Sequence, residues 1–177
     1  MTRLLRIMAW SLLGLSTFSL ALPASTAADP SHQTQGAQMT TDTQHLTPQA
    51  QGAQFLEDNL KKPGVQTLPG GLQYQVEIKG EGDAPKLTDT VEVMYEGRLI
   101  DGTVFDSSYA RQQSATFGVN QVIVGWQTAL QHMTPGAKWT LYIPSELAYG
   151  AQGVPGAIPP HSVLIFTVEL LKVHHTA

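Results

Sequence analysis

The chain has 177 residues, which is enough for one domain with a hydrophobic core plus an appendage. Charged residues make up 14% and hydrophobic residues 42%, so most of the chain should fold, and the net charge of −4 excludes the basic surplus typical of nucleic-acid binding. The lack of cysteine excludes disulfides, a thiol nucleophile and a cysteine-ligated metal.

Residues 1–27 are typical of a signal peptide. Arg3 and Arg6 precede an apolar run from Ile7 to Leu22, which is shorter than the ~20 residues that span a bilayer. Small residues at 25–27 fit a cleavage site near Ala27, so we expect export to the periplasm or secretion and no membrane span in the mature chain. A retained membrane anchor is the less favoured alternative. Residues 28–46 have almost no large apolar side chain and are predicted to be a disordered linker.

Residues 47–66 are predicted to form an N-terminal helical arm. Thr47 and Pro48 suit an N-cap and a first turn, and Lys62-Pro63-Gly64 should end the helix. A helix of this length is marginal alone, so its apolar face (Ala53, Leu56 and Leu60) must pack on its own domain or on a second chain. A homodimer through this helix is the leading expectation for a partner chain, and a monomer is the alternative.

The rest of the chain predicts an α+β domain over residues 67–177. Alternating apolar residues indicate strands at 72–79, 91–105, 115–117, 138–143 and 163–173, with a turn at 101–102 inside the second range. Trp126, Ala129, Leu130 and Met133 follow the helical period, whereas 109–114 looks like a polar loop. We expect a single twisted antiparallel sheet wrapped around this one short helix.

The hairpin over 91–108 contains the first candidate site residues. Phe105 is followed directly by Asp106, and Tyr95 lies on the other arm, so the three side chains could form an apolar cup with one polar group. An ordinary hairpin that ends in an exposed acid explains this stretch equally well. Trp126 and Phe166 suit plain core packing, but the long Gly/Pro-rich loop over 148–162 favours a functional pocket.

Three blocks of sequence resemble the FKBP-type peptidyl-prolyl cis-trans isomerases. They are VEVMYEGRLIDGTVFDSS, VIVGWQTAL and LAYGAQGVPGAIPPHSVLIFTVELL, and the resemblance extends over residues 68–173 in order. The lead-in KPGV followed by TLPGGLQY is similar to the secreted bacterial Mip (macrophage infectivity potentiator) branch.

The resemblance implies an FKBP-like fold and a set of site residues. Tyr95, Asp106 and Tyr149 would be the catalytic residues. The side chains that bind the proline-containing peptide would be Phe105, Arg111, Phe117, Val122, Ile123, Trp126, Ile158 and Phe166. Trp126 would form the floor, Ile123 would donate its backbone N–H to a peptide carbonyl, Tyr149 would donate its hydroxyl to another, and Asp106 would remain ionised beside Arg111.

The implied activity is rotation of X–Pro bonds in exported polypeptides, with tacrolimus and rapamycin as inhibitors in the same pocket. Amide resonance sets a barrier of about 18–20 kcal/mol, which a dry pocket lowers by disfavouring the more polar planar amide. No cofactor or metal is expected, and Ser107 and Ser108 lack the context of a hydrolase nucleophile. Ala115, Val154 and Ala157 depart from many family members at the rim. The alternative function is a chaperone or adhesion-type binding module that keeps the pocket without using isomerisation.

Two predictions concern histidines. His132 and His161 have no companion typical of a metal ligand set, so both are interpreted as structural or solvated. His174 and His175 are expected to belong to a frayed terminus, and binding of stray metal by this pair is the less favoured alternative.

Overall fold

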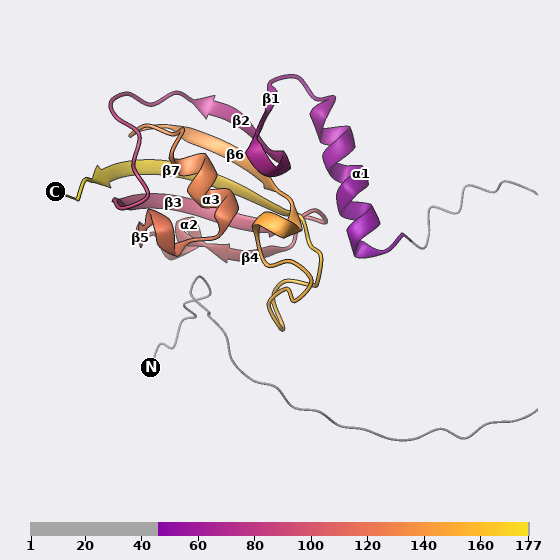
Figure 1. Cartoon of the computed structure of the whole chain (residues 1–177). Helices are drawn as coiled ribbons and strands as arrows, with labels where there is room; N and C mark the ends of the chain where they lie inside the picture. Colours follow the sequence, from indigo (N-terminus) through magenta and orange to yellow (C-terminus); the bar gives the residue numbers. More distant parts are fainter. Residues whose placement is uncertain (1–45, 177) are drawn as a thin grey trace, which may run out of the picture. The chain divides into compact units, whose positions relative to one another are not determined.

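A single antiparallel sheet organises residues 46–176, which are the residues described by the computed structural model (Figure 1). It has seven strands in the order β1-β2-β6-β7-β3-β4, and β5 also pairs with β3. The strands are β1 (Val65–Leu68), β2 (Leu72–Ile78), β3 (Thr90–Leu99), β4 (Val104–Ser107), β5 (Ala115–Gly118), β6 (Lys138–Ile143) and β7 (Leu164–His174). The helices are α1 (Pro48–Leu60), α2 (Ser108–Arg111) and α3 (Val124–Leu130), with short 3-10 turns at Pro69–Gly71, Val119–Gln121 and Ser145–Leu147. The expected α+β class with one antiparallel sheet is confirmed.

Helix α3 packs against the concave face of the sheet. Trp126, Ala129 and Leu130 are fully buried, so the helical period in the sequence identified the correct face of α3. The helix ends at Leu130, so Met133, which is also fully buried, lies beyond it. The helix lies close to β6, because a Cβ on Gly125 would be only 2.5 Å from Ile143 Cγ2. The sheet side of this core consists of alternate residues of β3, β6 and β7, namely Val91, Val93, Tyr95, Leu141, Ile143, Leu164, Phe166, Val168 and Leu170.

Strand β3 has two partners in succession along one edge. Its first half, Thr90–Val93, pairs with β5, and Glu96–Arg98 pairs with β4. Its other edge pairs with β7 over its whole length. Helix α2 connects β4 to β5 beside the break between the two partners, at the position of Tyr95. Residues 109–114 were predicted as a loop, but a one-turn helix forms there because Ser107 caps it.

Helix α1 packs on the domain of its own chain, which is one of the two outcomes left open by the sequence. The N-cap prediction is confirmed, since Thr47 Oγ1 accepts a hydrogen bond from Ala50 N–H. The predicted apolar face is wrong: Ala53 and Leu60 are exposed, whereas Gly52 and Asn59 are buried. A Cβ on Gly52 would lie 2.8 Å from Val163 Cγ2, so the missing side chain is what lets the helix approach.

Polar side chains complete the α1 contact. Gln73 Nε2 donates to the Leu56 carbonyl at 2.9 Å, and Asn59 Nδ2 donates to Gln73 Oε1 at 2.9 Å. Phe55 packs beside Tyr142, with ring centroids 6.1 Å apart. Gln73 belongs to the polar face of the alternating strand β2, which would ordinarily face solvent, but α1 covers it and leaves it 3% exposed.

The end of β7 is tied to the loop before β3, so the expected frayed terminus is wrong as far as Thr176. His175 Nδ1 lies 2.9 Å from Asp89 Oδ2, and Thr176 N–H donates to Asp89 Oδ1 at 3.0 Å. Thr176 Oγ1 also donates to the Thr88 carbonyl at 2.7 Å. Asp89 is only 1% exposed.

The predicted signal peptide and most of the predicted linker lie outside the described residues. Within residues 46–176, no helix has the length and apolar character needed to cross a membrane. Strand β1 was not predicted from the sequence, because it is only four residues long and runs directly into the turn at Pro69–Gly71. Its pairing with β2 defines it.

Candidate active site

Trp126 of α3 and four other aromatic side chains pack together in one cluster. Trp126 contacts Tyr95, Phe117 and Phe166 edge to face, with ring centroids 5.4, 6.1 and 5.3 Å apart. Phe105 continues the wall by packing edge to face on Phe166 at 5.5 Å. Edge-to-face contacts are the favoured geometry for aromatic pairs, so these five rings pack together as one apolar cluster, called the Trp126 cup below.

Each ring of this cup comes from a different element. Tyr95 lies on β3, Phe105 on β4, Phe117 on β5 and Phe166 on β7, while Trp126 lies on α3. The branching of β3 between β4 and β5 is therefore what brings the rings together. Sequence reasoning missed Gly97: a Cβ there would lie 2.6 Å from the rings of both Phe105 and Phe166. A glycine inside a strand was the available signal, because it marks a close approach.

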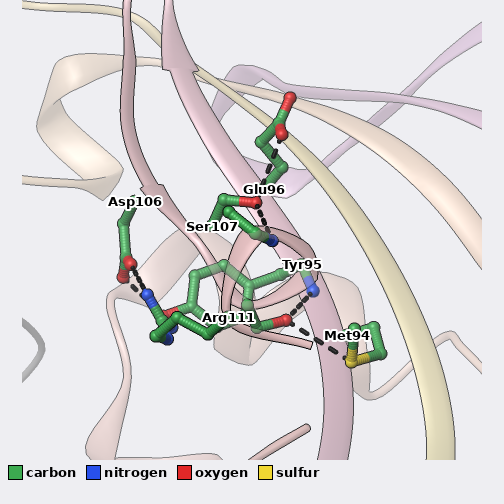
Figure 2. A network of polar contacts seen from close by, with 8 residues as sticks. Met94, Tyr95, Glu96, Asp106, Ser107 and Arg111 are labelled. Carbon is green, nitrogen blue, oxygen red and sulfur yellow. Dashed lines mark hydrogen bonds and ion pairs between the residues drawn. The ribbon is translucent and has the colours of Figure 1, made fainter. Parts of the chain in front are cut away.

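One charged pair lies at the edge of the cup (Figure 2). Tyr95 Oη donates to Asp106 Oδ2 at 2.5 Å, and Arg111 Nη1 donates to Asp106 Oδ1 at 2.5 Å. Arg111 Nη2 also donates to Tyr95 Oη at 3.1 Å. Figure 2 shows Asp106, Arg111 and the Tyr95 ring converging on one point. The predicted proximity of Arg111 to Asp106 is therefore present in the structure.

Burial, followed by the hydrogen bond to Asp106, raises the pKa of Tyr95 to about 12. The phenol is therefore a neutral hydrogen-bond donor throughout the neutral pH range. The Asp106 side chain is 18% exposed and the Arg111 side chain 35% exposed, so the pair stands at the boundary between the core and solvent.

The 148–162 loop carries Tyr149 and Ile158. Val154 and Ile158 exchange two backbone hydrogen bonds of 2.7 and 2.8 Å, and His161 N–H donates to the Gly150 carbonyl at 2.8 Å. Gly153 has φ +59°, and a Cβ there would meet the Ile158 carbonyl oxygen at 2.3 Å. Burial raises the pKa of the Tyr149 hydroxyl, and the negative charge of Asp106 adds to this.

The remaining predicted site residues precede α3. Val122 is buried, as is Ile158, and both join the cluster that contains Trp126; Ile123 is half-buried against it. The Ile123 carbonyl accepts from Trp126 N–H at 2.9 Å and from Gln127 N–H at 3.1 Å, which begins the helix. Its own N–H has no acceptor among the described residues, so this donor remains available to a ligand.

Residues 81–171 match the model of the FKBP-type peptidyl-prolyl cis-trans isomerases. The chain belongs to this family. Residues 20–76 match the domain found amino-terminal to FKBP-type peptidyl-prolyl isomerases. The FKBP resemblance stated from three sequence blocks is thus confirmed.

Similar FKBP proteins come from bacteria. The peptidyl-prolyl cis-trans isomerase Mip of Coxiella burnetii (strain RSA 493 / Nine Mile phase I) is 59% identical over 67% of this chain and 52% of the relative. The outer membrane protein MIP of Legionella longbeachae is 48% identical over 72% of this chain and 55% of the relative. The crystal structure of FkpA from Escherichia coli has a TM-score of 0.68 and 50% identity, covering 71% of this chain and 58% of that one. The chain spans about half the length of the curated relatives it matches.

Proposed function

We propose that the protein is a peptidyl-prolyl cis-trans isomerase that binds proline in the Trp126 cup. The observation that carries this proposal is the ring of Tyr95, Phe117 and Phe166 around Trp126, with a single carboxylate already paired to Arg111. A proline ring is apolar and compact, so it suits an aromatic cup at whose edge Asp106 and Arg111 neutralise each other.

Rotation about an X–Pro bond makes and breaks no covalent bond, so the site has to stabilise a twisted amide. The planar amide is more polar than the twisted one, and transfer into the apolar cup therefore disfavours the ground state. In this proposal Trp126 forms the floor, Phe105, Phe117 and Phe166 form walls, and Val122 and Ile158 support them. The free N–H of Ile123 and the hydroxyl of Tyr149 hold the carbonyls of the peptide on either side of the proline.

A proline-limited assay tests this function. Purified protein should accelerate isomerisation in a protease-coupled peptide assay and in refolding of a protein whose slow step is proline isomerisation. Rapamycin should inhibit both, because we propose that macrolides occupy the same cup. Rapamycin binding without acceleration of either reaction would support the alternative of a binding module instead.

We further propose that the protein acts outside the inner membrane on exported polypeptides. The basic, apolar and small-residue pattern of residues 1–27 supports export, as does its similarity to a relative named as an outer membrane protein. The mature protein should begin near Ala28 when purified from its natural source. N-terminal sequencing that returned Met1 would contradict this.

The proposed division of the chain is a signal peptide (1–27), a linker (28–46), a helical arm (47–66) and the isomerase domain (67–177). Strand β1 begins at Val65, so the last residues of the arm already pair with the domain. A homodimer through the arm would have to use the outer face of α1, because the inner face is covered by the chain itself. Leu60, 48% exposed, lies on that outer face. Light scattering of the mature chain with and without residues 28–61 tests the dimer, since equal monomer masses would exclude it.

A further inference from the structure

The position of Arg111 depends on the shortest helix of the domain. Helix α2 contains only Ser108–Arg111, and Arg111 is its last residue. From there the guanidinium turns back toward the residue just before the helix cap, Asp106, and toward Tyr95 Oη. An isolated helical turn is unstable because few hydrogen bonds compensate for its ordering, so something other than its own backbone has to hold α2 in place.

Two serines hold α2 against β3. Strand pairing places Ser107 opposite Glu96, so the next residue opposite Tyr95 would be Ser108. At this point the chain has already turned into α2. The Ser108 hydroxyl oxygen therefore accepts the hydrogen bond from Tyr95 N–H, at 2.8 Å, that a backbone carbonyl would accept in a continued strand. This bond fixes the backbone of Tyr95, and Ser108 is fully buried.

Ser107 links three parts of the site. Its hydroxyl accepts a hydrogen bond from Ala110 N–H at 3.2 Å, which caps α2, and donates to Glu96 Oε2 at 3.2 Å (Figure 2). Its backbone is still extended, with φ −152° and ψ 118°, which is the conformation an N-cap requires. Ser107 is 7% exposed, so water competes little for these bonds. The chain of contacts runs from β3 through Glu96 and Ser107 to the turn that carries Arg111.

We propose that Ser107 is a positioning residue for the isomerase reaction: by capping α2 and anchoring it on Glu96, it holds Arg111 against Asp106 and the Tyr95 hydroxyl. This inference rests on the proposed function, because Ser107 acts on the substrate only through Arg111. Removal of the cap shifts the equilibrium of the turn toward disorder by about fivefold, the usual effect of losing a serine cap. Asp106 then loses its counter-charge for part of the time.

A double-mutant cycle tests the proposal. Ser107→Ala, Arg111→Ala and the double variant are compared with wild type by kcat/KM in the peptide assay. We expect Ser107→Ala to lower kcat/KM about threefold, Arg111→Ala about five- to tenfold, and the double variant no further than Arg111→Ala. Ser107→Thr, which keeps the capping hydroxyl, should restore activity to near the wild-type value. Ser114→Ala is the matched control, since it removes a serine–glutamate bond to the same strand (Ser114 to Glu92, 2.6 Å) without affecting the cap.

A second measurement does not depend on catalysis. The NMR signal of the Arg111 Nε–H, assigned by its loss in Arg111→Ala, should move toward that of a free arginine side chain in Ser107→Ala and return in Ser107→Thr. Wild-type activity in Ser107→Ala or Arg111→Ala, or simple additivity of the two, would overturn the proposal. If wild type itself has no isomerase activity, the proposed function fails, while the Arg111 signal still decides whether Ser107 positions the guanidinium.

Discussion

Asp106 has a partner on each carboxylate oxygen, a tyrosine hydroxyl on Oδ2 and a guanidinium on Oδ1. Both partners hold the carboxylate in a fixed position at the edge of the cup. A group used as a general base would need to be able to accept a proton from the substrate, but amide rotation transfers none. The geometry therefore favours an electrostatic and orienting role for this acid.

Replacement of this acid should weaken catalysis without abolishing it. Asp106→Ala should lower kcat/KM by about tenfold, equivalent to about 1.4 kcal/mol of transition-state stabilisation. The wild-type rate should be nearly flat across neutral pH, because the Tyr95 phenol, with a pKa of about 12, remains neutral there. Measurement of kcat/KM between pH 6 and about 8.5 checks both points. A fully active Asp106→Ala variant would show that Asp106 is an ordinary hairpin residue without a role in catalysis.

Trp126 lies in the core and, in the proposed function, also forms the floor of the cup. It is fully buried, and three aromatic rings contact it edge to face. Trp126→Ala should lower the free energy of unfolding by about 3–5 kcal/mol and also greatly reduce kcat/KM. Trp139→Ala is the control: Trp139 is 7% exposed but stacks on Tyr74 away from the cup. The Trp139→Ala variant should be less stable in urea denaturation, but its folded fraction should keep the wild-type activity. Equal losses of activity in the two variants would contradict the role of Trp126 as the floor of the cup.

At the scale of elements, α1 shows how a poorly amphipathic helix can still dock. Its contact depends on the backbone at Gly52, the two amides of Asn59 and Gln73, and the Phe55–Tyr142 ring pair. None of these is an apolar stripe at helical spacing. The contact also reaches Val163, directly before β7 and directly after the loop that carries Tyr149 and Ile158.

A larger side chain at position 52 should displace this helix. Leucine is a good helix former, so Gly52→Leu would stabilise a free helix, but here it must enter the space of Val163. We expect the free energy of unfolding to fall by about 1–3 kcal/mol from overpacking. Ala53→Leu, one residue along on the exposed side, should change it by less than about 0.5 kcal/mol. Urea denaturation measures both, and a stabilised Gly52→Leu variant would show that α1 does not pack as described.

At the scale of the whole molecule, Asp89 joins two distant parts of the chain. Its carboxylate accepts hydrogen bonds from the backbone N–H groups of Lys86 and Thr176, and His175 adds a further contact. These backbone bonds first, and His175 in addition, lower the pKa of Asp89 from 3.8 to about 2. The loop before β3 is thereby fastened to the end of β7, its neighbour in the sheet.

The sign of the resulting pH dependence follows from this lowered pKa. Folding favours the ionised carboxylate, so its contribution to stability is fully present above about pH 4 and is lost as the pH falls toward 2. Asp89→Asn should therefore be less stable than wild type at pH 7, and the difference should shrink as the pH falls through this window. Thermal unfolding at several pH values measures it, with the exposed loop variant Asp83→Asn as control. A stability difference that is constant with pH would exclude Asp89 as the titrating group.

Local patterns in the sequence were sufficient to predict the helices and strands whose buried residues recur at a regular spacing. The period of Trp126, Ala129 and Leu130 identified the buried face of α3, and β6 has the predicted bounds Lys138–Ile143. The hairpin of β3 and β4 was also predictable, because alternation and a glycine turn are local signals. Tyr95, Phe105, Trp126 and Phe166 lie in the three sequence blocks that resemble the family, so these aromatic residues of the cup could be named from the sequence, whereas Phe117 lies between two blocks and was placed by the family resemblance.

The burial of polar groups and the contacts that hold the aromatic site in place depend on the tertiary structure and could not be predicted from the sequence. Gln73 is buried because a helix that ends more than ten residues earlier covers it, and His175 is held by Asp89, which lies in the loop before the neighbouring strand β3. Gly97 and Ser107 support the cup through partners on other strands, which no local pattern encodes. Local periodicity depends on neighbours along the chain, whereas burial and hydrogen-bond partners depend on segments that meet only after folding.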